Sequence, residues 1–352
     1  MQTKEIMYTG IGERMKIVVL GGGISTERHV SLVSATSVCK ALRSIGHQAI
    51  FVDMFFGLEN YEGDLDALFD SEDGLCGEVA IEHVEPDIEA IKASRKCNES
   101  GRLGKNVLEI CKLADCVFLG LHGNDGEDGK IQAALDLLGI PYTGSGHLGS
   151  AMAMDKIVAK RIMRSAGIPC APETDHAPCV VKCATGGSSI GVFICDTDEE
   201  YQEALEKVRK YGDSYIVEKK ISGRELTVPV LDGKALSPIE IVPPESGKFD
   251  YVSKYQSGEE GAAEICPARL TEEETALVSD LAVRFHQALG LSVYSRTDFI
   301  LDENGKAWCL ETNTLPGMTP NSLIPKAARL EGLDYPHLCE KIVTLSLEKH
   351  TS

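Results

Sequence analysis

The sequence lacks the cysteine patterns of a zinc-binding or secreted protein. Twelve cysteines are spread over 352 residues without a Cys-x-x-Cys pair and without cysteine–histidine spacing typical of a zinc site. We expect buried thiols, with disulfide formation or metal binding as an alternative for Cys179 and Cys183, which flank an expected strand. A signal-peptide pattern and an apolar run of about eighteen residues are also absent. These absences predict a cytoplasmic protein without a membrane partner.

Positive charge is scarce. The 35 lysines and arginines are outnumbered by 54 aspartates and glutamates, which gives a net charge of −19. This balance argues against nucleic acid as a partner, although a small anionic substrate is compatible with lysines and arginines that converge locally. No Walker A sequence occurs, so a P-loop NTPase is excluded at the level of motif. The sequence also has no internal repeat and no low-complexity segment.

Two glycine-rich segments imitate a dinucleotide fingerprint without completing it. Residues 21–23 follow an expected strand and Asp53 ends the next one, but the third glycine of the fingerprint is missing. Residues 144–149 have the spacing, but no convincing strand leads into them. NAD binding is therefore a remote alternative.

The first third of the chain has the pattern of a parallel α/β sheet. Short apolar runs predict strands, and Ser25 or Thr26 is expected to cap a helix after the first of them. The loops of such a sheet gather at the strand ends, where ligands bind. The acidic segment 57–105 is poorly patterned. The expected strands are 16–20, 48–52 and 116–121, and the helix is expected to bury Val30, Leu32, Val33 and Val38.

After a boundary at 139–146, a helical segment and further strands are expected, and from about residue 231 the chain predicts an antiparallel α+β domain. A helix after Thr271 opens with a capping box, Thr271 and Glu274, and ends at Gly290. The predicted fold class is α/β, with α+β in the C-terminal half. The helix is expected to bury Leu277, Leu281, Phe285 and Leu289; further elements are expected at 179–182, 191–195, 199–211, 214–219 and 225–231.

The most informative segment is a predicted β-hairpin, in which alternating runs at 293–301 and 306–312 flank a Glu-Asn-Gly turn. A two-residue turn places one set of polar side chains on one face, whereas a three-residue loop breaks this parity. Facing carboxylates repel each other, and a cation such as Mg²⁺ or Mn²⁺ shared with a nucleotide phosphate removes the repulsion. The alternative is a solvated sheet face. The set comprises Arg296, Asp298, Glu311 and Asn313.

A second group of residues fits a nucleotide. An expected strand delivers Lys182 to the loop 186–191, whose N–H groups and hydroxyls suit phosphate oxygens; an ordinary Gly/Ser hairpin is the alternative. Residues 218–221 end a strand and can present backbone groups to a purine edge, with Glu225 within reach of a ribose. For these residues the alternative is solvated charge.

Three features have two interpretations each. Glu27 is either a first-turn acid that favours the helix dipole or a buried carboxylate that holds a substrate ammonium. His122 lies at a strand end, where α/β sheets bind ligands, but a lone histidine is often structural. The polar, aromatic segment 248–259 is either a lid that excludes water or a surface loop.

Taken together, these pieces resemble the D-alanine–D-alanine ligases of the ATP-grasp superfamily. They occur in the order found in that family, from about residue 15 to 345, and the combination is specific although no single piece is. The matching motifs are Gly21–Leu32, His122–Gly129, Tyr142–Gly146, Met154–Lys156, Gly187–Gly191, Lys254–Tyr255, Cys266–Ala268, Arg296-x-Asp298 and Glu311–Leu323.

The resemblance implies an ATP-grasp fold of three domains that begins with a Rossmann-like parallel sheet, the preATP-grasp domain, and it implies a homodimer. The segment 57–105 is longer than in the shortest relatives and is expected to decorate the first domain. The implied divisions are a tail at 1–14, the preATP-grasp domain at 15–141, a central domain at 142–221, and a C-terminal domain at 222–352 with a lid loop at 246–260.

The resemblance also implies a reaction, in which ATP and two D-alanines give D-alanyl-D-alanine through a D-alanyl phosphate, for peptidoglycan precursors. The implied cofactors are ATP and two Mg²⁺ (or Mn²⁺) ions per site. Tyr255 favours an amine nucleophile, and Leu323 leaves a small apolar pocket suited to a methyl group. The alternative is the same scaffold making D-alanyl-D-serine or D-alanyl-D-lactate, because an apolar pocket rejects an added hydroxyl only modestly.

Site residues follow from the resemblance position by position. Two departures, Cys183 in place of proline and Thr185-Gly186 in place of Arg-Glu, make the phosphate loop more flexible than usual. The implied roles are ATP binding by Lys156, Lys182, Ser189, Glu218, Lys219, Ile221 and Glu225; metal binding by Asp298, Glu311 and Asn313; substrate binding by His122, Lys254, Gly317, Ser322 and Leu323; and catalysis or site closure by Glu27, Ser188, Tyr255 and Arg296.

Overall fold

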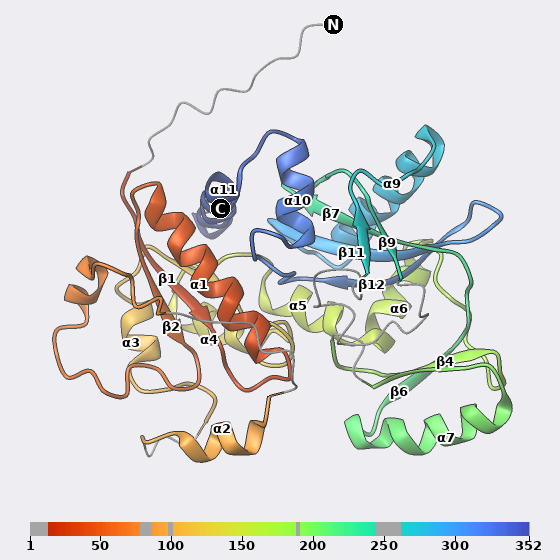
Figure 1. The fold of residues 1–352 in the computed structure, drawn as a ribbon, viewed down its shortest axis with the longest axis horizontal. Helices are drawn as coiled ribbons and strands as arrows, with labels where there is room; N and C mark the ends of the chain where they lie inside the picture. Colours follow the sequence, from red (N-terminus) through yellow and green to blue (C-terminus); the bar gives the residue numbers. More distant parts are fainter. Residues whose placement is uncertain (1–12, 78–85, 98–100, 188–190, 244–261, 352) are drawn as a thin grey trace, which may run out of the picture.

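The computed structural model describes residues 13–77, 86–97, 101–187, 191–243 and 262–351 (Figure 1). The tail 1–14 lies almost entirely outside this range, and the lid loop 246–260 lies entirely outside it. None of the helices in these ranges is long and apolar enough to cross a membrane. All twelve cysteines are free, and Cys179 and Cys183 are buried thiols.

The N-terminal sheet is parallel, as the βαβ pattern predicts. Its strands are β1 (Lys16–Gly21), β2 (Gln48–Asp53) and β3 (Cys116–Leu119), in the order β2-β1-β3. Buried Ile17, Val19 and Leu20 show why β1 is central. The surrounding helices are α1 (Arg28–Ser44), the 3₁₀ turn η1 (Asp66–Asp70), α2 (Ile88–Ser94), α3 (Val107–Cys111) and α4 (Lys130–Leu138).

Two expectations for α1 were wrong. The residue at its N-cap is Glu27, and neither Ser25 nor Thr26 caps it. The Ser25 hydroxyl instead donates a hydrogen bond to the His122 carbonyl oxygen at 2.8 Å, a tertiary contact that competes with capping. Leu32 and Val33 are only partly buried, although Val30 and Val38 are buried as expected.

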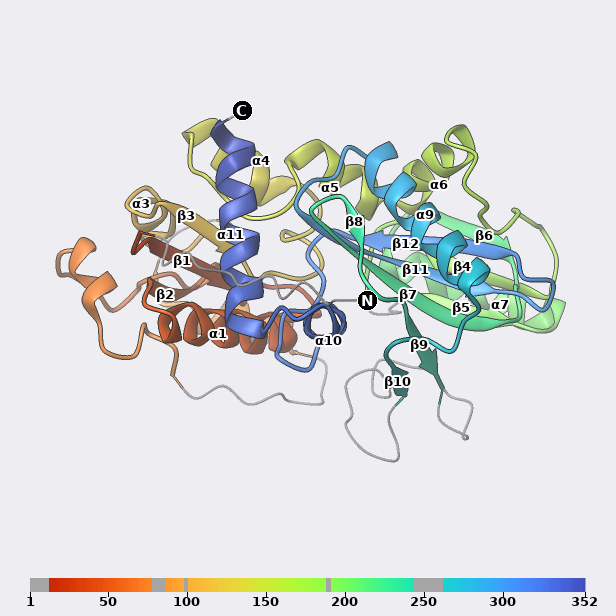
Figure 2. The ribbon, with the colours of Figure 1, turned by 90° about the horizontal axis from the view of Figure 1, so that it is seen from above.

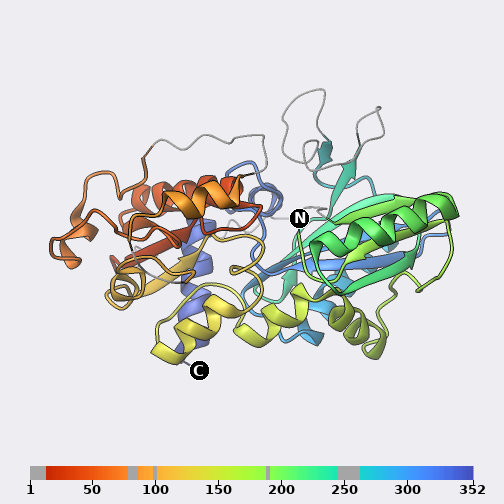
Figure 3. The same ribbon diagram turned by 90° about the horizontal axis from the view of Figure 1, so that it is seen from below.

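A small antiparallel sheet follows in the order β5-β4-β6. Thr197 and Glu200 form a capping box that starts α7, which covers one face of this sheet (the green helix in Figure 3). The bounds are β4 (Cys179–Cys183), β5 (Val192–Cys195), α7 (Asp198–Val208), the 3₁₀ turn η2 (Arg209–Tyr211) and β6 (Tyr215–Lys219).

The third sheet is antiparallel, in the order β10-β9-β7-β11-β12, and β8 pairs with β7. The capping box of Thr271 and Glu274 is present at the start of α9. The expectation that α9 buries Leu277 was wrong. Leu277 is 38% exposed, and the next residue, Val278, is buried instead. The bounds are β7 (Arg224–Leu231), β8 (Lys234–Ala235), β9 (Ile239–Val242), β10 (Ala263–Ile265), α9 (Glu272–Ala288), β11 (Tyr294–Leu301) and β12 (Ala307–Asn313).

Four helices connect the sheets. Helices α5 (His147–Met154) and α6 (Lys156–Ser165) contribute to the apolar core of the third sheet. The chain then returns from β12 through α10 (Leu323–Leu330) to α11 (Tyr335–Thr351), which packs on α1 (Figures 1 and 2). The segment between β12 and α10 therefore runs from the third sheet to the N-terminal core.

Candidate active site

The hairpin of β11 and β12 brings its polar residues together by an unexpected route. Asp302 N–H donates to the Lys306 carbonyl oxygen at 3.0 Å, which closes a three-residue loop rather than the expected two-residue turn. A bulge at Leu310 then restores the parity that the loop breaks. As a result, Asp298 lies directly opposite Glu311, as the shorter turn had predicted.

Each carboxylate of this pair contacts a cationic side chain. Asp298 accepts hydrogen bonds from Arg296 at 3.0 and 3.1 Å and from Asn313 Nδ2 at 3.2 Å. Glu311 Oε2 lies 3.1 Å from Lys156 Nζ at the start of α6. The two cations offset the like-charge repulsion across the hairpin. The structure thus brings Lys156 to the face formed by Asp298, Glu311 and Asn313, the acid–amide face, although 142 to 157 residues separate it from them in sequence.

Lys156 also reaches the glycine-rich loop. Its ammonium donates to the Gly186 carbonyl oxygen at 2.8 Å. Burial lowers the pKa of Lys156, but the Glu311 carboxylate outweighs this effect and leaves the pKa above its usual value. Lys156 is therefore a fixed positive charge between the loop and the hairpin.

Glu218 on β6 joins two further lysines. Its carboxylate lies 2.7 Å from Lys182 Nζ on β4 and also contacts Lys160 Nζ on α6. Burial raises the pKa of Glu218, yet the two ammonium groups outweigh it and hold the pKa below its usual value. Sequence reasoning missed Lys160, although its position one helical turn after Lys156 places both lysines on the same face.

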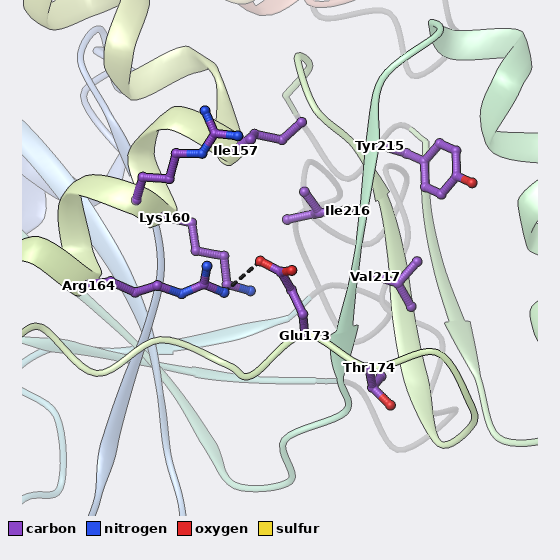
Figure 4. Close-up of a pocket in the computed structure, with 9 residues that line it drawn as sticks. Ile157, Lys160, Arg164, Glu173, Thr174, Tyr215, Ile216 and Val217 are labelled. Carbon is purple, nitrogen blue, oxygen red and sulfur yellow. Dashed lines mark hydrogen bonds and ion pairs between the residues drawn. The ribbon is translucent and has the colours of Figure 1, made fainter.

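The remaining nucleotide candidates lie around the end of β6. Lys219 is exposed, its N–H donates to the Pro172 carbonyl oxygen at 2.8 Å, and Ile221 and Glu225 are half-buried. Lys160 also lines a cavity of about 440 Å³ between α6 and β6. Figure 4 shows Ile216 pointing toward α6, and the cavity contains none of the site residues expected from the sequence.

Glu27 is buried and is the N-cap residue of α1, so it is a buried carboxylate that also lies at the start of the helix. A Cβ atom at Gly123 or at Gly187 would lie 2.7 Å from Glu27 Oε2, so the backbone of both glycines lies close to this carboxylate. The carboxylate therefore lies between the loop after β3 and the glycine-rich loop.

His122 uses both ring nitrogens within the protein. Nδ1 lies 2.9 Å from the Leu315 carbonyl oxygen, and Nε2 lies 3.1 Å from Ser34 Oγ. Burial lowers the pKa of His122, which favours the neutral ring. Nearby Glu127, which sequence reasoning also missed, is buried and accepts hydrogen bonds from Gly123 N–H and Leu315 N–H.

The last group surrounds the start of α10. A Cβ atom at Gly317 would lie 3.1 Å from Ser322 Oγ, and Ser322 Oγ accepts a hydrogen bond from Thr319 N–H at 3.0 Å. Leu323 is the half-buried first residue of α10. The expected site residues outside the described part of the chain are Ser188, Ser189, Lys254 and Tyr255.

Comparisons with known proteins identify relatives along nearly the whole chain. The family model described as D-ala D-ala ligase N-terminus matches residues 16–145, and the one described as D-ala D-ala ligase C-terminus matches residues 162–344. A D-alanine–D-alanine ligase of Pediococcus pentosaceus is 41% identical over 94% of this chain and 97% of its own. That of Halalkalibacterium halodurans is 40% identical over 95% and 100%.

Solved structures show the same likeness. The D-alanine–D-alanine ligase of Coxiella burnetii has a TM-score of 0.72 at 26% identity, covering 97% of this chain and 96% of its own. The Bacillus anthracis enzyme complexed with ATP has a TM-score of 0.72 at 29% identity, covering 97% and 99%. The ATP-grasp fold predicted from the sequence is thereby confirmed, and the chain belongs to the D-alanine–D-alanine ligase family.

Proposed function

We propose that the protein is a D-alanine–D-alanine ligase, which joins two D-alanines at the expense of ATP for peptidoglycan precursors. The observation that carries the proposal is the contact of Lys156 with Glu311, because it brings a phosphate-binding cation to the acid–amide face. A carboxylate is a poor electrophile, so a ligase must first give it a leaving group.

The reaction has two steps. The carboxylate of the first D-alanine attacks the γ-phosphorus of ATP, ADP leaves with the electron pair of the broken P–O bond, and D-alanyl phosphate forms. The uncharged amine of the second D-alanine then attacks the acyl carbon; inorganic phosphate leaves and the nitrogen loses a proton. In both steps the protein mainly positions the reactants and neutralises charge.

We assign the nucleotide to the lysines around the glycine-rich loop. Lys156 and Lys182 exchange their carboxylate partners for ATP phosphates, with Ser189 as a further phosphate ligand. Residues 218, 219 and 221 hold adenine at the end of β6, and Glu225 holds the ribose. The support is the convergence of Lys156 and Lys182 from α6 and β4 on the carboxylates that face them.

We assign two Mg²⁺ or Mn²⁺ ions to Asp298, Glu311 and Asn313. The donors are hard oxygens, which suit these ions. The described residues contain no group of three His, Cys, Asp or Glu side chains that could hold a metal. Asp298, Glu311 and Asn313 supply too few ligands to surround two ions, so the proposed ions would also bind phosphate oxygens of ATP. Bound there, the ions would neutralise charge on the phosphoryl oxygens.

The amino acid sites are assigned to the loops beside these groups. Glu27 holds the first ammonium, and His122 lies near the first carboxylate; the burial of Glu27 supports the former. Arg296 and the Gly317 N–H stabilise the tetrahedral oxyanion. The second carboxylate is assigned to Lys254, Ser322 and the Leu323 N–H, and closure of the site to Ser188 and Tyr255.

We further propose that the chain forms three domains, at 15–141, 142–221 and 222–352. The tail 1–14 precedes the first domain, and the lid loop 246–260 belongs to the third. We also propose that the protein is a homodimer.

In the decisive experiment, the protein is incubated with ATP, Mg²⁺ and D-alanine, and the product is identified by mass. We expect D-alanyl-D-alanine together with ADP and phosphate. Absence of the dipeptide would falsify the proposal, and parallel reactions with D-serine and D-lactate identify alternative acceptors.

A further inference from the structure

The backbone of Leu315 is held at both of its polar groups by side chains of one distant loop. Its N–H donates to Glu127 Oε1 at 3.2 Å, and its carbonyl oxygen accepts from His122 Nδ1 at 2.9 Å. The two partners come from the loop after β3, 188 and 193 residues earlier in the chain. Two segments that are remote in sequence are therefore fixed to each other.

One carboxylate forms the centre of this link. Glu127 Oε2 accepts a hydrogen bond from Gly123 N–H at 2.9 Å, while its other oxygen holds Leu315. A parallel link passes through His122 Nε2 to Ser34 Oγ, which accepts from Met318 N–H at 3.4 Å. Because a carbonyl oxygen can only accept, His122 carries its proton on Nδ1 and Nε2 accepts from Ser34.

The two linked segments lie beside the proposed ammonium site and the proposed oxyanion site. Leu315 lies between Asn313, at the end of the acid–amide face, and Gly317. Gly123 lies against the Glu27 carboxylate, since a Cβ atom built on Gly123 would lie 2.7 Å from Glu27 Oε2. Because Gly123 N–H and Leu315 N–H both donate to the Glu127 carboxylate, Glu127 fixes the spacing between the proposed ammonium site and the proposed oxyanion site.

We propose that Glu127 is a positioning residue for the ligation, which aligns the two amino acid sites by joining Gly123 N–H to Leu315 N–H. This inference rests on the proposed function. Glu127 does not contact the reacting atoms; it acts through the backbone of the two loops. A misplacement of about 1 Å at a reacting centre costs on the order of a hundredfold in rate, so the link is important for catalysis.

The protonation state of Glu127 determines the pH at which the proposal should be tested. Burial, reinforced by the nearby carboxylate of Glu27, raises the pKa of Glu127 to about 8, while Gly123 N–H, Leu315 N–H and the more distant Arg296 oppose the rise. Both oxygens accept hydrogen bonds best when the group is ionised. Assays at about pH 9, where a carboxyl with this pKa is mostly ionised, therefore examine the intact link.

The test compares Glu127→Gln with Asp128→Asn. The glutamine amide would point a donor at one of the two N–H groups, whereas Asp128 contacts only Lys130 and backbone of its own loop. For Glu127→Gln we expect kcat/KM for D-alanine to fall by at least about tenfold, with the Kd of a non-hydrolysable ATP analogue changed less than about threefold. Asp128→Asn should stay within about twofold of wild type on both measures.

A double-mutant cycle with Ser34→Ala tests whether the two links act on one loop. If both position the segment 315–318, the double variant should lose less activity than the product of the single losses. Ser34→Ala also keeps the proposal testable if Glu127→Gln does not fold, because it alone should then lower kcat/KM for D-alanine without weakening nucleotide binding.

Three results overturn the inference. They are D-alanine kinetics of Glu127→Gln within tenfold of wild type, an equal loss of nucleotide affinity, and multiplicative effects in the cycle. Failure here is distinguishable from failure of the proposed function, because wild-type protein that forms D-alanyl-D-alanine maintains the function whatever Glu127→Gln does. Wild-type protein that forms no dipeptide refutes the function itself.

Discussion

At the scale of residues, a buried ammonium group must be paired, and Lys160 is paired with Glu218. Glu218 is shared with Lys182, so removing Lys160 leaves Lys182 as its remaining lysine partner and makes transfer of Lys182 to a phosphate harder. We predict that Lys160→Met raises the KM for ATP by about tenfold, equivalent to about 1.4 kcal/mol, and leaves the KM for D-alanine nearly unchanged.

The matched control for this prediction is Arg161→Met. Arg161 is the next residue on α6 and is exposed, so it loses the same charge without disturbing Glu218. Steady-state kinetics with each substrate varied in turn measure both effects. Equal ATP constants for the two variants would show that Lys160 does not control Lys182.

The acid–amide face gives a second residue-scale prediction. Asp298→Asn and Glu311→Gln keep the size of the side chains but remove the charges that would hold divalent ions. We expect D-alanine-dependent phosphate release to fall by about a hundredfold or more, while circular dichroism stays that of wild type. Full activity in either variant would remove the metal assignment.

Residue-scale contacts divide sharply into those that sequence reveals and those it does not. Asp298 and Glu311 were predicted to face each other because they lie in two alternating runs of one hairpin, although their observed register also depends on the bulge at Leu310. Glu127 and Lys160 were missed because their partners, Leu315 and Glu218, lie 188 and 58 residues away. Only tertiary packing brings such pairs together, and no local period records it.

At the scale of elements, the strands that were predicted lie within about two residues of their observed positions, because apolar runs and turn residues mark them. The short strands β8, β9 and β10 were not predicted. The hairpin loop was mistaken by one residue, since Gly305 at φ 74° supports a three-residue loop as readily as a two-residue turn. The bulge at Leu310 corrected the register, and nothing in the sequence announces it. Asp298 still faces Glu311 as predicted, because the longer loop and the bulge shift the register by one residue in opposite directions.

The contact of α9 with β11 gives a prediction about pH. His286 is buried and its Nδ1 lies 2.8 Å from Ser295 Oγ. Burial lowers the pKa of His286 to about 4, whereas the unfolded chain retains the usual value of 6.5. Between these values the unfolded state binds more protons, so the free energy of unfolding falls as pH decreases from 6.5 toward 4, by roughly 3 kcal/mol from this group.

Urea unfolding of wild type and His286→Gln over this pH range measures the effect. The glutamine cannot titrate, so its unfolding free energy should depend less steeply on pH than that of wild type. Above about pH 7 the two slopes should agree, because His286 is neutral in both the folded and unfolded states there. Identical slopes below pH 6 would show that His286 is not held neutral by the fold.

At the scale of the whole molecule, each hydrophobic core combines segments that are far apart in the sequence. The last helix, α11, packs on α1, and α6 packs into the core of the third sheet. Neither docking leaves a local signal, because an amphipathic helix shows that it has an inner face but not which sheet receives it. This arrangement places the segment 314–322 between two cores and brings the proposed substrate groups together.

The proposed homodimer makes the final prediction. Leu137 near the end of α4 and Leu148 near the start of α5 are 89% and 62% exposed, and because the two helices contact each other these leucines are candidates for a contact surface. If they form part of the dimer surface, Leu137→Glu combined with Leu148→Glu should bury two charges there and shift the protein to a monomer in light scattering after gel filtration. Ile194→Glu is the matched control, since Ile194 is also 62% exposed but lies on strand β5 rather than on α4 or α5. A double variant that stays dimeric would place the contact surface elsewhere, whereas a wild-type protein that is already monomeric would refute the dimer itself.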